Sequence, residues 1–277
     1  MATSSIPPSP CSDSYDVVII GGATSGSEIA WFLVSNSNFK GKVLVVEKDP
    51  SLAYSATQAS NNCMRQQFAT EINVKIAQYA TESVKDFRNN LKCEDGDGIP
   101  DIPIRNFGYL YLADTPGFAA VLEEDQKLLA NCSAGTKMLS ADEIASKYPF
   151  FALDDIKAGS LNTAGEGAFD TLGMGHGVRC EAQQLGVDYI NNEVVGLTRV
   201  GNAVTSVTLK TGENISVDNV VNAAGTRAAE VSRLAGVELP IEARLRYTYI
   251  FSVDETLCQD LPLTIDPTGA HAIIWKG

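Results

Sequence analysis

The sequence predicts an α/β fold in which a parallel sheet carries an inserted second domain. Residues 15–20 (YDVVII) form a short apolar run with the β-branched composition of a buried parallel strand. A glycine-rich turn and a helical stretch follow, and residues 42–47 (KVLVVE) form a second such run. Strand, turn, helix and strand within about 33 residues make a βαβ unit. Helices and strands alternate at both ends of the chain, so the insertion is expected between them.

The first half of the chain continues with a long amphipathic helix that Thr70 is placed to cap. Residues 94–103 are rich in Gly, Asp and Pro, which is typical of a crossing between domains. The apolar positions of the helix follow helical spacing and are Ile72, Ile76, Ala80, Val84, Phe87 and Leu91.

The next elements are predicted from strand alternation, helical spacing and turn signals. A capping box, Ser140 to Glu143, opens a short helix that Pro149 stops. We expect a strand at 107–112, helices at 118–130 and from Asp170 toward Leu185, strands at 187–190, 193–200, 203–209 and 215–221, a helix after Gly225, and a long strand at 240–253.

Composition limits the classes of function. The formal net charge is −13, which disfavours nucleic acid and anionic lipid as partners, although solubility alone also explains it. No apolar run reaches the roughly 18–20 residues of a membrane span. The six cysteines form no C-x-x-C pair and only two histidines accompany them, so no metal site is expected. Buried free thiols indicate a reducing compartment, which favours the cytoplasm and leaves the mitochondrion open.

Residues 1–14 are rich in Ser and Pro and contain no Arg or Lys. They lack the apolar core of a secretory signal and the arginines of a transit peptide. A disordered tail is therefore predicted for this segment.

The turn from Gly21 through Gly22, Ala23, Thr24 and Ser25 to Gly26 matches the dinucleotide-binding pattern G-x-G-x-x-G, with Ala23 at the middle glycine. The first glycine permits a tight turn, and the third permits close helix–strand packing. A pyrophosphate would sit at the helix N-terminus, where unpaired N–H groups favour an anion. A purely structural glycine turn remains the alternative.

Glu47 ends the second strand, about 20 residues beyond the turn. Its carboxylate can accept hydrogen bonds from both ribose hydroxyls and would repel a 2′-phosphate. The pattern therefore predicts an adenine dinucleotide other than NADP.

These segments resemble the FAD-dependent oxidoreductases related to D-amino-acid oxidase and to sarcosine and dimethylglycine dehydrogenases, most closely the branch of FAD-dependent oxidoreductase domain-containing proteins. The resemblance runs from about Tyr15 to Gly269. The segments that carry it, in the same order, are YDVVIIGGATSG, VVEKD, MRQQF, FGYLYLA, GEGAFD, VVNAAG and LPIEARLRYTYIF.

The resemblance implies that FAD is the cofactor and which residues bind it. The turn would hold the pyrophosphate, Glu47 and Lys48 the adenosine side, and Val194 the adenine through its backbone. Ser55 begins the stretch beside the flavin ring. Ala224 and Gly225 would leave space for the dinucleotide, although an ordinary helix-packing turn also explains them.

The same resemblance implies roles for three arginines. Arg65, in the R-Q-Q-F segment, would be the catalytic residue that stabilises negative charge on reduced flavin; the alternative is a surface arginine. Arg244 and Arg246 lie in the strand that resembles the substrate-domain sheet. They would bind a substrate carboxylate, or else they are solvated strand charges.

Two departures from the resembling family stand out. Asn62 and Cys63 replace two glycines before the R-Q-Q-F segment, and their larger side chains are expected to crowd the flavin. The sequence also ends at Gly277, where relatives continue for roughly a hundred residues, so the chain is expected to be truncated.

The resulting expectation is a Rossmann-like FAD-binding domain at 15–95 and 153–237, with an α+β substrate domain, incomplete, at 96–152 and 238–277. It would oxidise the C–N bond of a small amine or amino-acid substrate of N-methyl or D-amino-acid type by hydride transfer to flavin, with oxygen or a carrier as electron acceptor. The rival functions are a non-catalytic flavin-binding assembly factor and an NAD-linked dehydrogenase.

Overall fold

The computed structural model describes residues 6–91, 99–252, 254 and 259–273. The chain divides into two compact units, the first made of residues 1–60, 91–100 and 171–249 and the second of 61–90, 101–170 and 250–277. Residues 61–90 and 153–170, which the sequence analysis gave to the FAD-binding domain, thus belong to the second unit. The functional domain boundaries themselves stay a prediction.

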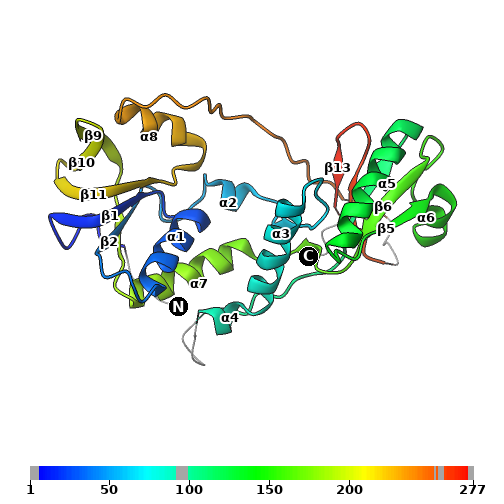
Figure 1. Ribbon diagram of the computed structural model, residues 1–277, viewed down its shortest axis with the longest axis horizontal. Helices are drawn as coiled ribbons and strands as arrows, with labels where there is room; N and C mark the ends of the chain where they lie inside the picture. Colours follow the sequence, from blue (N-terminus) through cyan, green and yellow to red (C-terminus); the bar gives the residue numbers. More distant parts are fainter. Residues whose placement is uncertain (1–5, 92–98, 253, 255–258, 274–277) are drawn as a thin grey trace. The chain divides into compact units, whose positions relative to one another are not determined.

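A six-stranded sheet forms the centre of the first unit (Figure 1). Its strand order is β8-β2-β1-β11-β10-β9, in which the first four strands are mutually parallel and β10 pairs antiparallel with both β11 and β9. The strands are β1 (Ser14–Ile20), β2 (Val43–Glu47), β8 (Asp188–Asn191), β9 (Val194–Val200), β10 (Ala203–Leu209) and β11 (Asn214–Asn222). The predicted βαβ unit and the four later strands are confirmed.

Alternation along β1 and β2 divides the core of this unit between the two faces of the sheet. Val17 and Ile19 pack with apolar residues of α1 and α7, whereas Val18 and Ile20 pack with those of β9 to β11 and α8. Residues on successive positions of a strand point to opposite faces, so a continuous apolar run indicates a strand buried on both. The helices are α1 (Thr24–Ser35), α2 (Ala56–Ala59), α7 (Thr171–Gln184) and α8 (Ala228–Leu234), which a 3-10 turn at Gly225–Arg227 precedes.

The second unit is built on a five-stranded sheet in the order β13-β12-β4-β6-β5, with a separate two-stranded pair, β3 and β7 (Figure 1). Its main core cluster includes Leu110, Ile144 and Leu161. The strands are β3 (Cys63–Met64), β4 (Tyr109–Ala113), β5 (Lys137–Ser140), β6 (Ala158–Asn162), β7 (Gly167–Ala168), β12 (Leu263–Ile265) and β13 (His271–Ala272). The helices are α3 (Glu71–Lys85), α4 (Phe87–Asn90), α5 (Pro116–Asn131) and α6 (Ala141–Lys147).

The predicted capping box of α6 is confirmed, with both reciprocal hydrogen bonds between Ser140 and Glu143 present. The prediction for α3 is wrong in two respects. Thr70 occupies the N-cap position but its side chain makes no capping hydrogen bond. Of the predicted apolar positions, Val84, Phe87 and Leu91 are buried, whereas Ile72 and Ile76 are exposed and Val74 is buried instead. Helical spacing alone does not decide which of two partly apolar stripes is covered.

The prediction of a disordered tail is wrong for residues 6–13. The carbonyl of Pro7 accepts a hydrogen bond from the Asn191 backbone, and that of Pro8 accepts one from the Asn192 side chain. Ile6 packs against the core on the α1 and α7 side. Local composition predicted disorder, whereas contacts with residues almost two hundred positions away hold the segment.

The long strand predicted at 240–253 is not formed at residues 240–252, and Val253 lies outside the described residues. A strand needs a hydrogen-bonding neighbour, and none within the described ranges pairs with this segment. Its apolar side chains, such as Leu245 and Ile250, are exposed. Residues 94–98 of the predicted domain crossing also lie outside the described part.

A glycine of the second unit gives the first testable prediction. Gly167 has φ +152°, and a Cβ there would lie 1.8 Å from the carbonyl oxygen of Arg105. Gly167→Ala should destabilise the second unit by about 3 kcal/mol or more. Gly117→Ala is the control, because a Cβ at this position in α5 meets nothing within 4 Å. Urea denaturation of both variants tests this, and equal midpoints would contradict it.

Candidate cofactor site

The glycine-rich turn closes the carboxyl end of β1 against its two neighbouring strands. Gly21 donates to the Val46 carbonyl at 2.9 Å, and Ala223 donates to the Ile20 carbonyl at 2.9 Å. Gly21 has φ +105°, and a Cβ there would lie 2.4 Å from the Ala223 oxygen; at Gly26 it would lie 1.9 Å from the Gly21 oxygen. Backbone packing thus requires glycine at both positions.

The N-terminus of α1 follows directly. Its N-cap is Ala23, and no side chain caps the first turn, which also contains no acidic residue. Helices ordinarily satisfy their first N–H groups with a Ser, Thr, Asp or Asn cap. An uncapped start leaves these donors and the positive end of the helix dipole available to an anion.

A cavity of about 770 Å³ in the first unit opens beside this helix start. Its volume lies within the range of small-molecule and cofactor pockets. Nine of the residues predicted to bind cofactor line it, namely Gly21, Ala23, Ser25, Glu47, Lys48, Ser55, Val194, Ala224 and Gly225.

The other three predicted residues lie at the edge of this cavity or behind it. Gly22 lines a smaller neighbouring cavity of about 320 Å³. The Thr24 hydroxyl lies 3.2 Å from that of Thr57, which does line the large cavity. Gly26 is buried in α1. Their role in cofactor binding stays a prediction.

Glu47 enters the cavity from the end of β2, but its carboxylate is already engaged. One oxygen accepts from the Gly22 backbone N–H at 2.7 Å, and the other accepts from that of Asp49 at 2.8 Å. Each carboxylate oxygen keeps further acceptor capacity, which suits ribose hydroxyls. Glu47 thus also fixes the glycine turn, a role that the sequence analysis did not foresee.

The lining also contains residues that the sequence analysis did not identify, and four of these are polar residues with contacts of their own. Asn192 follows β8, and its side-chain amide donates to the Pro8 carbonyl and to the Thr211 hydroxyl. Since parallel strands end at one edge, the residue after β8 could have been expected there. The other three are Thr57, Glu193 and Arg227.

Glu193 lies among cations at the cavity. A hydrogen bond from Lys210, with the charges of Lys48 and Arg227, lowers the pKa of its carboxyl. It is 3.1 Å from the Lys210 ammonium and 3.8 Å from the Arg227 guanidinium. The part of the cavity lining around Glu193 therefore carries both negative and positive charges.

The return turn at the end of β11 is held by Asn222. Its side-chain amide donates to the Ala228 carbonyl and to the Ser232 hydroxyl, while its oxygen accepts from the Ala224 N–H. Gly225 follows with φ +56°. These bonds keep small residues against the cavity.

In the second unit, Arg65 packs between aromatic rings. Its guanidinium carbon lies 4.8 Å from the ring centre of Phe68 and 5.7 Å from that of Tyr111. Burial raises the pKa of Tyr111, and the Arg65 charge opposes that rise. The side chain is half-buried, and its catalytic role stays a prediction. Arg244 pairs with Glu242 at 2.6 Å on an exposed segment, as expected of a solvated charge.

Glu166 is a fully buried carboxylate of the same unit that the sequence analysis did not single out. It accepts from the backbone N–H of Gln66 at 2.7 Å and from the side-chain amide of Gln67 at 2.9 Å. Burial nevertheless raises its pKa to about 7. The two glycines that flank Glu166 in GEGAFD were the sequence signal that could have identified it.

Thiols, metal ligands and membrane spans complete the inventory. The described cysteines, Cys11, Cys63, Cys132 and Cys180, are reduced, while Cys93 and Cys258 lie outside the described ranges. No group of three or more acidic, His or Cys side chains in the described part is placed to hold a metal ion. Nor does any helix there combine the length and apolarity needed to cross a bilayer.

Glu166 makes stability depend on pH. Its pKa of about 7 in the folded state exceeds its ordinary value of 4.5, so the folded state holds the proton more tightly. The resulting stabilisation is complete below about pH 4.5 and is lost as pH rises through about 7. Relative to Glu166→Gln, the wild type should lose roughly 3 kcal/mol across this window. Hydrogen exchange at buried amides of β4 and β6 measures the stability of both proteins across this pH range, with the exposed Glu123→Gln as control. A stability difference between wild type and Glu166→Gln that does not change with pH would contradict the prediction.

Comparison with known proteins points to one family. A family model described as FAD dependent oxidoreductase matches residues 16–277. The chain is 29% identical to FAD-dependent oxidoreductase domain-containing protein 1 of Xenopus laevis, over 97% of the chain and 59% of that protein. It is 25% identical to mouse mitochondrial sarcosine dehydrogenase, over 92% of the chain and 27% of the relative. The chain thus spans about 59% of the length of the first of these relatives.

Solved structures show the same fold. L-proline dehydrogenase from P. horikoshii superposes with a TM-score of 0.69 at 22% identity, over 84% of this chain and 57% of that one. Glycine oxidase from Geobacillus kaustophilus gives a TM-score of 0.66 at 20% identity, over 82% and 59%. With the family model covering nearly the whole sequence, the chain belongs to the FAD-dependent oxidoreductase family of the D-amino-acid oxidase type, whose cofactor is FAD.

Proposed function

We propose that this chain is an oxidoreductase that oxidises the C–N bond of a small amine or amino acid of N-methyl or D-amino-acid type. The observation that carries the proposal is the uncapped start of α1 at a glycine turn, beside a cavity of about 770 Å³. That combination suits a pyrophosphate and an adenosine. Family membership and the likeness to sarcosine dehydrogenase support the reaction class.

The chain's own residues would divide the work of binding. The first N–H groups of α1 would hold the pyrophosphate, and Glu47 would accept from the ribose hydroxyls. Small residues at Ala224 and Gly225 would leave space along the dinucleotide. We assign FAD binding to the first unit and substrate binding to the second.

Bound FAD supplies a hydride acceptor for the C–H bond next to the substrate nitrogen. Loss of the hydride would leave an iminium ion, or an imine where the nitrogen also loses a proton, and water would hydrolyse it to an amine and a carbonyl compound. We propose Arg65 as the cation that stabilises negative charge on the reduced cofactor. The electron acceptor, oxygen or a carrier protein, then takes the electrons.

The rival functions differ from this one in measurable ways. An NAD-linked dehydrogenase would not be yellow as purified, and FAD dependence of the family disfavours it. A non-catalytic flavin-binding assembly factor would bind FAD but would leave it oxidised with every amine.

The first test of the proposal concerns cofactor affinity. Glu47→Gln replaces one of two carboxylate acceptors by an N–H donor that faces the backbone N–H of Gly22 or Asp49. FAD affinity should fall about tenfold, corresponding to roughly 1–2 kcal/mol. Glu230→Gln, which removes another carboxylate from the same lining, should change it less than about twofold. A fluorescence titration decides, and an unaltered Kd for Glu47→Gln would contradict the assignment.

The second test concerns the reaction. Anaerobic mixing of the FAD-loaded chain with sarcosine, N,N-dimethylglycine and a panel of D-amino acids should bleach the flavin band with at least one of them. Arg65→Met should slow this bleaching by about tenfold or more, since a charge that stabilises the reduced state is lost. Bound flavin that every compound leaves oxidised would favour the non-catalytic alternative instead.

A further inference from the structure

No cation among the described residues forms an ion pair with the buried carboxylate of Glu166. The groups that favour its ionised form are amides of Gln66, Gln67 and Asn162. Burying a carboxylate is costly, and buried charges are usually paired with an opposite charge. The neighbouring β3–α3 segment and β4 also carry titratable or charged side chains, namely Cys63, Arg65, Tyr109 and Tyr111. An amide or an apolar residue would fill the site at lower cost, so the carboxylate itself needs an explanation.

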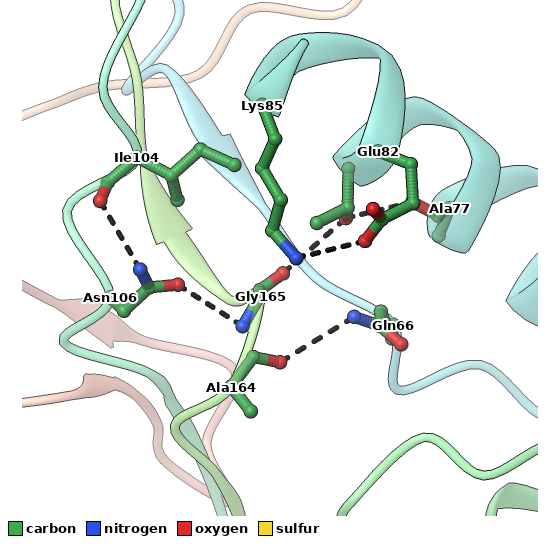
Figure 2. Close-up of polar contacts among 9 residues, drawn as sticks. Gln66, Ala77, Glu82, Lys85, Ile104, Asn106, Ala164 and Gly165 are labelled. Atoms are coloured by element: carbon green, nitrogen blue, oxygen red, sulfur yellow. Dashed lines mark hydrogen bonds and ion pairs between the residues drawn. The ribbon is translucent and has the colours of Figure 1, made fainter.

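The backbone on both sides of Glu166 is fixed so that the side chain points inward. Gly165 has φ +67°, and a Cβ there would lie 2.7 Å from the Gln66 side chain. Its N–H donates to the Asn106 side chain at 3.0 Å, and the Glu166 carbonyl accepts from Gly108 at 3.0 Å. Figure 2 shows the part of this arrangement before Glu166, where Asn106 reaches Gly165 and Gln66 points toward Ala164. The backbone on either side of Glu166 is therefore held in place independently of the contacts of its carboxylate.

The two carboxylate oxygens bind two successive residues of one short segment. Gln66 is bound through its backbone and Gln67 through its side chain. The Gln67 amide also donates to the Tyr109 carbonyl at 3.1 Å, and its oxygen accepts from the Ser160 hydroxyl at 2.9 Å. Glu166 thus ties the link between β3 and α3 to the sheet of the second unit.

Arg65 is the residue immediately before this anchored pair. Its guanidinium lies over the rings of Phe68 and Tyr111, at 4.8 and 5.7 Å. Gln66 and Gln67 are both buried, so the backbone that carries Arg65 cannot shift without breaking bonds to Glu166. The orientation of the guanidinium therefore depends on the carboxylate.

We propose that Glu166 is a positioning residue that acts through Arg65: its two oxygens together fix the Arg65–Gln67 segment, and through it the place of the guanidinium charge. This inference rests on the proposed function, in which Arg65 stabilises negative charge on reduced FAD. Two acceptors are needed because both partners present N–H groups. A glutamine at 166 would turn one of its own N–H groups against a donor.

The experiment uses the FAD-loaded chain and sulfite as the probe. Sulfite adds reversibly to oxidised flavin and leaves negative charge on the ring, which a positioned cation stabilises. Sulfite Kd is measured for wild type, Glu166→Gln, Arg65→Met and the double variant, with Glu123→Gln as the exposed control. Glu166→Gln should raise the sulfite Kd about five- to tenfold while FAD content stays unchanged. In the Arg65→Met background the same substitution should have no further effect, since coupled residues are not additive.

A second readout needs no cofactor. The Gln66 amide should exchange with solvent at least about tenfold faster in Glu166→Gln than in wild type or Glu123→Gln, because its acceptor is lost or reversed. Unchanged exchange at Gln66 would overturn the anchoring step. The positioning role would be overturned if Glu166→Gln had the sulfite Kd of wild type. It would also be overturned if Glu166→Gln raised the sulfite Kd equally in the wild-type and Arg65→Met backgrounds. Failure of the wild-type chain to bind FAD would instead overturn the proposed function, with the exchange result still deciding the anchoring step.

Discussion

The close approach of the Gly21–Gly26 turn to the end of β11 is the constraint on which the cofactor site depends. The Gly26 backbone packs against the Gly21 oxygen, and Gly21 packs against Ala223 so tightly that no Cβ fits at either glycine. Three parallel strands therefore end at nearly one point, and α1 starts there without a side-chain cap. The cavity opens beside these ends, where the lining residues Gly21, Ala23, Ala224 and Gly225 are small.

Local signals were sufficient for the elements that build this constraint. Apolar β-branched runs identified β1 and β2, and the glycine spacing identified the turn, so nine predicted residues are found together in one cavity lining. Asn192 and Arg227 were not identified, because their positions depend on which strand lies next to β2 and on the path of the chain after β11. Neither is encoded in a window of neighbouring residues. A ligand role for each lining residue is still a prediction.

The predictions that proved wrong share a physical origin. The strand at 240–252, the tail at 6–13 and the buried stripe of α3 each depend on whether a distant partner covers the segment. Alternation and helical spacing report what a segment is able to bury, while pairing and burial are tertiary events. Residues 6–13 gained such a partner in the residues after β8, and residues 240–252 have none in the described ranges.

The departure at Asn62 and Cys63 shows how the second unit accommodates larger residues near Arg65. Asn62 has φ +56°, a left-handed conformation that glycine adopts freely and that asparagine tolerates best among the other residues. Its carbonyl accepts from the Phe169 N–H at 3.0 Å, and Cys63 continues into β3 opposite Ala168. Asn62 and Cys63 therefore fit this chain path, and β3 pairs with β7 beside Glu166. The anchoring of the Arg65–Gln67 segment consequently depends on the carboxylate and the backbone turn, and does not require glycine at 62 or 63.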